Sequence, residues 1–553
     1  MIGVRANPGE EEVVREFFEL FKTPWEFYRS GRQYDVYLST TGAPVAGSTA
    51  KTALIYSGNG IPLDERAGVE IVAERTGTVL AYGAGRLPIY GRTVAFRDGG
   101  IGLETAERPR QPVAYAVRTE GPVVVRVGYD LFAEVRALLT EGQPSANAGI
   151  PALDIHIALL RELIGWSGVP LVEIPPVPAG YRFIACLTHD VDHPSIRRHR
   201  WDHTTFGFLL RACFGSIIDV CWGRAPIQDL LTNWAAAVRL PFVHLGVASD
   251  FWSELHRYVA IDGGAASTFF VIPRKDYAGQ THDGEAPRRR AARYGARDIA
   301  DEIRKLMAAG CEIGVHGIDA WLDSSRGREE LAEVSGITGA SEAGVRMHWL
   351  YGSEKSPAIL EQAGFAYDST SGYNDTIGYR AGTTQVFKPP GTTWLLELPL
   401  HVMDTALFYP GHLDLAPRAA RQAVSAIIDN ALRFGGTVTV NWHDRSIAPE
   451  RLWGRVYRDV VADLARQEAW FPTASQAVSW FRKRRAAVFE TVSWTPEAVR
   501  VKVSVGAGEH LPGLRLRIHK AREHRGEAAI GHDIPGEYVD VVMRQTTDTS
   551  IPW

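Results

Sequence analysis

The chain of 553 residues has only four cysteines, Cys186, Cys213, Cys221 and Cys311. No two of them have the spacing of a zinc ribbon or of a redox motif. Cys186 and Cys311 stand in apolar, strand-like runs, where a free cysteine usually serves as a small buried hydrophobic residue. The sequence therefore shows no disulfide framework, which indicates a reducing compartment.

Neither sign of charge is in excess, because 60 lysines and arginines face 64 aspartates and glutamates, for a formal charge of -4. A protein that binds nucleic acid normally carries a basic excess or a basic stripe. We therefore expect no nucleic-acid partner.

Long apolar runs are also missing. Residues 1–14 contain no apolar segment, so we expect no secretory signal and predict a cytoplasmic protein. No run reaches the ~18 apolar residues that a membrane span needs. The nearest one, residues 206–222, is interrupted by Arg211 and Asp219. It predicts a buried or subunit-facing helix, and the alternative is an amphipathic helix in peripheral association with a membrane. The oligomeric state is not predicted.

The length predicts two or three domains, since single hydrophobic cores stop growing below this size. Residues 1–172 predict an α/β domain of unknown role, and a proline-rich linker follows it. Residues 181–485 alternate between strand and helix patterns, with a helical insertion at about 195–265. Residues 490–553 predict a small β-rich extension. A polar, basic stretch at 274–295 predicts a mobile loop with a solvated run of arginines.

Seven candidate strands occur within residues 181–485. They are FIACLT, STFFVI, CEIGVH, GVRMHWL, FAYDS, LLELPL and GTVTVNW. Helical patterns between several of them favour a parallel sheet, and in a closed (β/α) barrel the reactive residues gather at the carboxyl ends of the strands.

Acidic and imidazole side chains follow these strands. Asp190 and Asp192 lie two residues apart, so they share one face of a regular strand. The other polar residues at strand ends are His316, Asp319, Arg346, His348, His443 and Asp444. Carboxylates and imidazoles that converge at one end of a barrel suit a divalent metal with open coordination positions. A spare carboxylate beside it can act as a base, and a histidine as an acid.

The order of these motifs resembles the polysaccharide deacetylase (NodB-type) family of metal-dependent carbohydrate esterases. AASTFFVIP and LMAAGCEIGVHG are similar to two family segments, ATFF and GHEIGxH. CLTHDVD stands where the family has TFDDG. VRMHW and VTVNWHDR stand at the third and last motifs. The resemblance covers roughly residues 181–485.

The resemblance implies a distorted (β/α)7-type barrel and a divalent metal, with Zn²⁺ expected and Mn²⁺ or Co²⁺ as alternatives. Asp190 takes the position of the catalytic base and Asp192 that of a metal ligand. His316 takes the position of the first metal-binding histidine. Arg346 orients the catalytic carboxylate, and His443 is the acid that protonates the leaving group.

Two departures from the family pattern leave alternatives open. The inserted Val191 allows Asp190 and Asp192 to exchange roles. Ala320 stands where the family has its second metal-binding histidine. Either Asp319 or His348 is the expected replacement, and His189 and His193 also flank the aspartates.

Two segments are candidates for substrate binding. The glycine-rich stretch 364–391 holds Asp368, Asn374, Asp375, Tyr379 and Arg380, and such a polar and aromatic loop suits a carbohydrate. A second segment ends a strand with His401 and Asp404. Either segment could instead be a surface loop or a strand cap.

The sequence thus favours a metal-dependent hydrolase that removes an N-acetyl or O-acetyl group from a sugar in bacterial polysaccharide or glycoconjugate biosynthesis. One alternative is a barrel that has lost catalysis and binds a glycan or acts as a scaffold. Another is a hydrolase of a non-sugar C–N amide bond.

Overall fold

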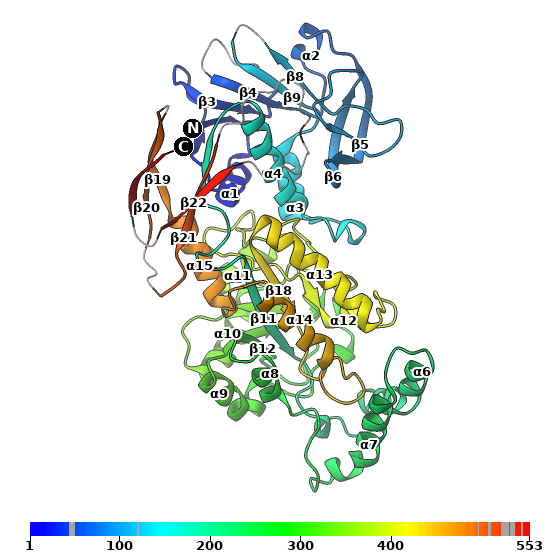
Figure 1. Ribbon diagram of the computed structural model, residues 1–553. Coiled ribbons are helices and arrows are strands. Elements are labelled where there is room, and N and C mark those ends of the chain that lie inside the picture. The colour runs from blue at the N-terminus through cyan, green and yellow to red at the C-terminus, as the bar shows by residue number, and fades with distance from the viewer. Residues whose placement is uncertain are drawn as a thin grey trace. The chain divides into compact units, whose positions relative to one another are not determined.

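The computed structural model describes residues 1–43, 50–118, 121–495, 497–506, 510–520, 530, 537–543 and 546–552. They form two compact units (Figure 1). The first unit comprises residues 1–180, 381–383 and 480–553, and the second comprises residues 181–380 and 384–479. The predicted N-terminal domain and C-terminal extension therefore group into one unit, and parts of both lie outside the described residues.

A six-stranded sheet forms the centre of the first unit, in the order β2-β1-β3-β4-β9-β8. All neighbours are parallel except β8 and β9. The strands are β1 (Ile2–Arg5), β2 (Trp25–Phe27), β3 (Tyr34–Ser39), β4 (Ala50–Tyr56), β8 (Ala114–Arg118) and β9 (Val123–Val127). The helices are α1 (Glu11–Phe21), α2 (Pro62–Arg66), α3 (Leu131–Thr140) and α4 (Ala152–Trp166).

Three smaller sheets complete this unit. The first contains β5 (Ile71–Tyr82), β6 (Gly85–Phe96) and β7 (Leu103–Thr105). The second pairs β10 (Leu171–Glu173) with β21 (Leu514–His519), and β21 with β22 (Tyr538–Met543). The third contains β19 (Val488–Trp494), β20 (Ala498–Ser504) and β23 (Thr547–Pro552). Strands β21 and β22 from the C-terminal part of the chain thus share a sheet with β10 from the N-terminal part.

A curled, fully parallel sheet organises the second unit, in the order β16-β15-β12-β11-β18-β17. The strands are β11 (Ile184–Val191), β12 (Ser267–Val271), β15 (Glu312–Gly317), β16 (Val345–Met347), β17 (Val402–Met403) and β18 (Thr437–Asn441). Every residue of β11, β12 and β18 is buried. Burial on both faces explains why these strands are continuous apolar runs in the sequence.

Helices surround this sheet (Figure 1). They are α8 (Leu255–Ile261), α9 (Ala300–Ala308), α10 (Ser324–Thr338), α11 (Ser356–Ala363), α12 (Asp404–Phe408), α13 (Pro417–Phe434) and α14 (Gly454–Arg466), and α15 (Ala474–Ala486) leads back to the first unit. The predicted helical insertion contains α5 (His203–Leu210), a π-helical turn (Arg211–Gly215), α6 (Ser216–Cys221) and α7 (Ile227–His244).

The sheet has six strands where the sequence predicted seven in a barrel. The predicted strands FAYDS and LLELPL are present only as isolated bridges, from Val345 to Asp368 and from Asp368 to Glu397. The Asp368 side chain accepts a hydrogen bond from the Thr370 backbone, and such an Asx turn stops an extended run. The alternation of apolar and polar residues along a strand does not reveal that a side chain competes with the sheet for a backbone N–H group.

Candidate active site

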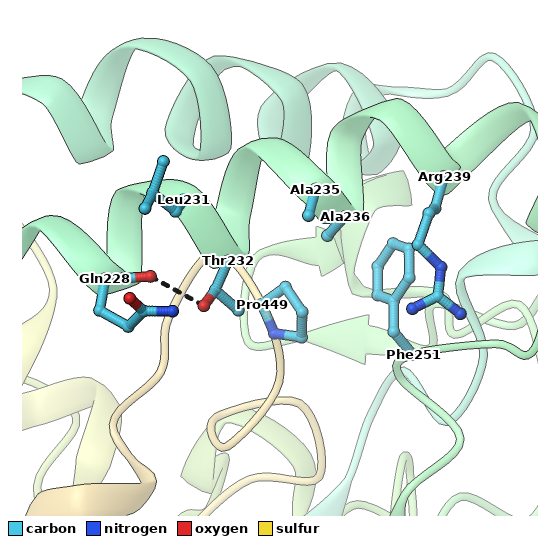
Figure 2. A pocket seen from close by; sticks show the side chains of 8 residues that line it. All are labelled: Gln228, Leu231, Thr232, Ala235, Ala236, Arg239, Phe251 and Pro449. Atoms are coloured by element: carbon cyan, nitrogen blue, oxygen red, sulfur yellow. Dashed lines mark hydrogen bonds between the residues drawn. The ribbon is translucent and has the colours of Figure 1, made fainter.

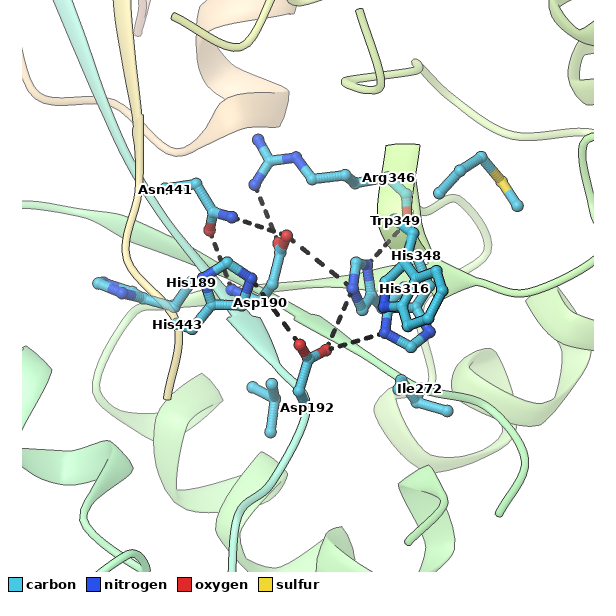
Figure 3. A network of polar contacts seen from close by, with 12 residues as sticks. His189, Asp190, Asp192, Ile272, His316, Arg346, His348, Trp349, Asn441 and His443 are labelled. Carbon is cyan, nitrogen blue, oxygen red and sulfur yellow. Dashed lines mark hydrogen bonds and ion pairs between the residues drawn. The ribbon is translucent and has the colours of Figure 1, made fainter. Parts of the chain in front are cut away.

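The carboxyl ends of the parallel strands meet at one edge of the curled sheet. A cavity of about 950 Å³ opens there. Its lining includes most of the strand-end residues predicted from the sequence, namely Asp190, Asp192, His316, His348, His443 and Asp444. Figure 3 shows Asp192 together with Asp190, His316, His348 and His443.

Asp192, His316 and His348 form a compact group of ligand atoms, all within 4.8 Å of one another. The Asp192 Oδ1 lies 3.3 Å from His316 Nε2 and 3.7 Å from His348 Nε2. A tetrahedral zinc ion with bonds of ~2.0–2.1 Å holds its ligand atoms about 3.4 Å apart. The spacing of this group therefore suits a divalent cation.

The orientation of His316 and the charge of His348 also suit a cation. His316 Nδ1 lies 2.9 Å from the Arg346 carbonyl oxygen and donates to it, so Nε2 is the ring nitrogen that faces Asp192. Burial lowers the pKa of His348 to about 3, so its ring is neutral. Asp192 Oδ1, the oxygen that both histidines face, is buried without a hydrogen-bond partner in the described chain. Since an unpaired buried polar atom is costly, the donor set fits a metal.

His348 reaches the group because of an unusual turn. Strand β16 ends at Met347, and the next residues, Trp349 and Leu350, have left-handed backbone angles, with φ of 64° and 52°. The buried guanidinium of Arg290 donates to the His348 carbonyl at 2.9 Å. The arginine run predicted to be solvated thus contributes one side chain that fixes this turn.

Asp319, the other predicted replacement for the missing histidine, has a structural role. Its carboxylate is fully buried and accepts hydrogen bonds from the Tyr277 hydroxyl, the Gln280 backbone and Arg326. Three donors already satisfy it, and it does not line the cavity. The structure therefore places His348, and not Asp319, beside Asp192 and His316.

We expect His348→Ala to weaken zinc affinity by more than about 100-fold, because losing a partner behind a ligand already costs about 10–100-fold. Asp319→Asn is the matched control and should leave affinity unchanged. Competition titration against a chromogenic chelator measures both. Equal losses in the two variants would contradict the assignment.

Asp190 is held beside this group but has other partners. Its carboxylate accepts from Arg346 Nη1 at 3.0 Å and from Asn441 Nδ2 at 2.7 Å, and it lies 3.9 Å from His316 Nε2. Burial would raise the pKa of Asp190, but Arg346 and the neighbouring histidines hold it below its usual value. The side chain is therefore an ionised carboxylate in a fixed position.

Arg346 is fully buried and also donates to Thr188 and to Ser369. We expect Arg346→Met to destabilise the protein by about 3–5 kcal/mol, because it leaves the Asp190 charge buried without its partner. Urea unfolding measures the change. The control is Arg297→Met. The Arg297 side chain is 78% exposed and forms a surface ion pair with Glu333, so its loss should change the free energy of unfolding little. Similar losses for both variants would contradict a role specific to the buried pair.

His443 faces Asp192 from the opposite side. Its Nε2 lies 3.8 Å from Asp192 Oδ2, and its Nδ1 lies 2.6 Å from Asp404 Oδ1. Burial alone would lower the pKa of His443, but Asp404, Asp192 and Asp190 raise it to about 10. The ring is therefore a protonated group aimed at the cavity. Asp404, predicted to bind substrate, instead orients His443.

The other predicted substrate-binding residues do not line the cavity. Tyr379 and His401 are buried and pack ring against ring, and the Tyr379 hydroxyl donates to the Ile427 carbonyl. Arg380 lies over the ring of Tyr373, and Asp375 is exposed. From this loop, Asn374 is the residue that lines the cavity. The loop folds largely into the protein, which its polar composition does not indicate.

The two histidines that flank the aspartates lie apart from the metal-ligand group. His189 is on the opposite face of β11, where its Nδ1 bonds the Trp442 carbonyl and its ring packs on Tyr258 and Phe269. His193 lines the cavity but bonds His199.

Sequence reasoning missed Asn441 and a group of arginines, whereas Asp444 lines the cavity as predicted. Asn441 precedes His443 by two residues on one strand face, and this spacing is the signal that could have identified it. Arg445 and Arg451 line the cavity beside Tyr409. The Arg445 Nη1 is buried without a partner in the part of the chain that the structure describes.

No protein-family model matches the chain, and no curated protein matches it. Among solved structures, the chain is similar to a protein from Mycobacterium smegmatis assigned as a polysaccharide deacetylase, with 20% identity over 56% of this chain and 95% of that one, at a TM-score of 0.35. A protein from Pseudomonas aeruginosa PAO1 with the same assignment has 15% identity over 58% and 97%, at 0.34. A family 4 carbohydrate esterase from Streptomyces lividans has 11% identity over 54% and 95%, at 0.25. These likenesses are distant and cover just over half of this chain.

Proposed function

We propose that this chain is a metal-dependent hydrolase that removes an acetyl group from the nitrogen of a sugar. The observation that carries the proposal is the arrangement around Asp192. Nitrogens of His316 and His348 face its carboxylate, and an ionised Asp190 and a protonated His443 lie close by.

A divalent cation held by Asp192, His316 and His348 would polarise the acyl carbonyl and acidify a water molecule. Asp190 is fixed by Arg346 and Asn441 and can accept the proton of that water. His443 is kept protonated by Asp404 and can give a proton to the leaving nitrogen. A barrel that only bound a glycan would not need these two groups beside a cation site.

The lining of the cavity supports a carbohydrate as the substrate. Trp349, Tyr351 and Tyr409 offer aromatic faces for sugar rings. The guanidinium of Arg445, which lines the cavity with an unpaired Nη1, can bind an anionic group such as a phosphate or a carboxylate. We infer that the acetylated sugar belongs to a negatively charged glycoconjugate, as in envelope or polysaccharide biosynthesis.

The test is acetate release after loading the purified protein with Zn²⁺, Mn²⁺ or Co²⁺. The substrates are neutral N-acetylated oligosaccharides, N-acetylhexosamine phosphates, O-acetylated sugars and a non-sugar acetamide. We expect release from the N-acetylated sugars, fastest with the phosphate and abolished by a chelator. Release from the non-sugar acetamide alone would favour an amide hydrolase. Glycan binding without any release would favour a non-catalytic barrel.

A further inference from the structure

The helical lobe, which we define as residues 195–254, has a well-packed inner face. Its buried residues, together with Ala448 from the body of the same unit, are Ile196, Phe208, Ala212, Ala236, Leu240, Val243, Phe251 and Trp252. Arg211 forms an ion pair with Glu450 at 2.6 Å, and Asp229 pairs with Arg455. The lobe is thus anchored to the sheet-containing body through this face.

Its outer face is apolar and uncovered. Among the described residues, 14 of the 21 large hydrophobic side chains that are exposed lie between positions 201 and 247. On α7 they recur every three or four residues, as Ile227, Leu231, Trp234, Val238, Phe242 and Leu245. On α5, the π turn and α6 they are Phe206, Leu210, Phe214, Ile217 and Ile218. Monomeric soluble proteins rarely expose such a continuous patch, so it marks an interaction surface.

Tryptophans and arginines border this patch. Trp201 is 86% exposed and Trp222 is 68% exposed, and Arg224 lies over the Trp222 ring. The exposed guanidinium groups of Arg197, Arg200 and Arg239 bond only carbonyl or hydroxyl oxygens, and none has an acidic partner in the described chain. Apolar side chains with bordering tryptophans and unneutralised arginines are the composition of a surface that lies in the head-group region of a membrane.

A hollow of about 300 Å³ lies on α7 where the apolar patch meets one of the exposed arginines. Figure 2 shows the residues that line it. Leu231, Ala235 and Pro449 supply apolar walls, and the Arg239 guanidinium stands at one end. A cationic group beside an apolar wall complements the phosphate and the upper acyl chain of a lipid.

The stretch His203–Cys221 is long and apolar enough to cross a membrane by length and composition, and most of it is not buried. Its packed residues Phe208 and Ala212 and the Arg211 ion pair hold it against the body of the unit instead. These contacts favour a helix that lies in the plane of the membrane surface.

We propose that the outer face of the helical lobe docks on a lipid bilayer that carries anionic head groups. His203 and Arg211 of the lobe also line the catalytic cavity, so docking holds that cavity beside the lipid surface. A glycolipid is then the fitting form of the substrate, a consequence that rests on the proposed function.

Flotation with phosphatidylcholine vesicles, with and without one quarter phosphatidylglycerol, tests the proposal on the full chain. We expect wild type to float with the anionic vesicles. The variant Phe214→Ser/Val238→Ser/Leu245→Ser should bind at least about tenfold more weakly, since it removes three exposed apolar side chains that would enter the bilayer. The matched control Met307→Ser/Trp394→Ser/Val542→Ser removes three exposed side chains elsewhere and should float like wild type. Arg197→Gln/Arg200→Gln/Arg239→Gln should lose the preference for phosphatidylglycerol.

A second measurement uses an environment-sensitive dye on Cys221, the only exposed cysteine of the four. Its emission should shift to the blue when anionic vesicles are added. A wild type that does not float, with unchanged emission, overturns the proposal. If the wild type is then found to be a dimer and the serine variant a monomer, the face binds a second copy of the chain. Acetate release from a soluble substrate by the serine variant reports separately on the proposed function.

Discussion

Asp192→Ala is expected to abolish metal binding and to lower kcat by about 10³-fold, because a bound metal supplies several kcal/mol of transition-state stabilisation. Asp192 is the carboxylate that both His316 and His348 face, at 3.3 and 3.7 Å. Elemental mass spectrometry on the purified protein, beside the acetate-release assay, measures both effects.

Asp444→Asn is the matched control for that variant. Asp444 also lines the cavity, and burial together with Asp192 raises its pKa to about 6, but it bonds the His193 backbone and lies outside the ligand group. Metal content should stay near wild type. If Asp192→Ala keeps stoichiometric metal, the ligand assignment fails, and an exchange of roles with Asp190 becomes the next hypothesis.

His443→Ala should lower kcat by about 10²–10⁴-fold, the usual contribution of a positioned acid or base. Metal content should stay unchanged, because His443 Nε2 lies on the far side of Asp192 and outside the ligand group. Parallel measurements of turnover and metal content separate these two effects.

Asp404→Asn refines the same prediction, since it keeps a hydrogen-bonding group beside His443 but removes the negative charge. We expect an intermediate loss of kcat with KM little changed. A loss of metal in His443→Ala would instead make His443 a ligand, and full activity in that variant would remove it from the mechanism.

Much of the candidate site follows from strand periodicity. Asp190 near the end of β11 and Asp192 just beyond it turn to the same face because side chains alternate, and His316 and His443 follow from the shared edge of a parallel sheet. These arguments need only the local sequence and the rule that parallel strands end together.

The remaining features depend on contacts between distant segments. His348 becomes the third member of the ligand group only through the left-handed turn at Trp349, which Arg290 supports from a segment nearly 60 residues away. Tyr379 and His401 belong to the core because distant strands and helices cover them. No periodic pattern predicts such tertiary placement.

The apolar outer face of the lobe is a case of two overlapping helical patterns. Within residues 206–222, Phe208 and Ala212 pack inward while Leu210 and Phe214 face out, so the sequence predicts a buried or subunit-facing helix, with an amphipathic surface helix as the alternative.

The two faces of β11 have a consequence for mutation. His189 is fixed in an aromatic pocket on one face, and Asp190 is fixed by Arg346 and Asn441 on the other. Deleting or inserting a single residue before position 189 would exchange the faces, which buries a carboxylate among rings and turns an imidazole toward the arginine. The segment should therefore tolerate side-chain substitution far better than any change in its length.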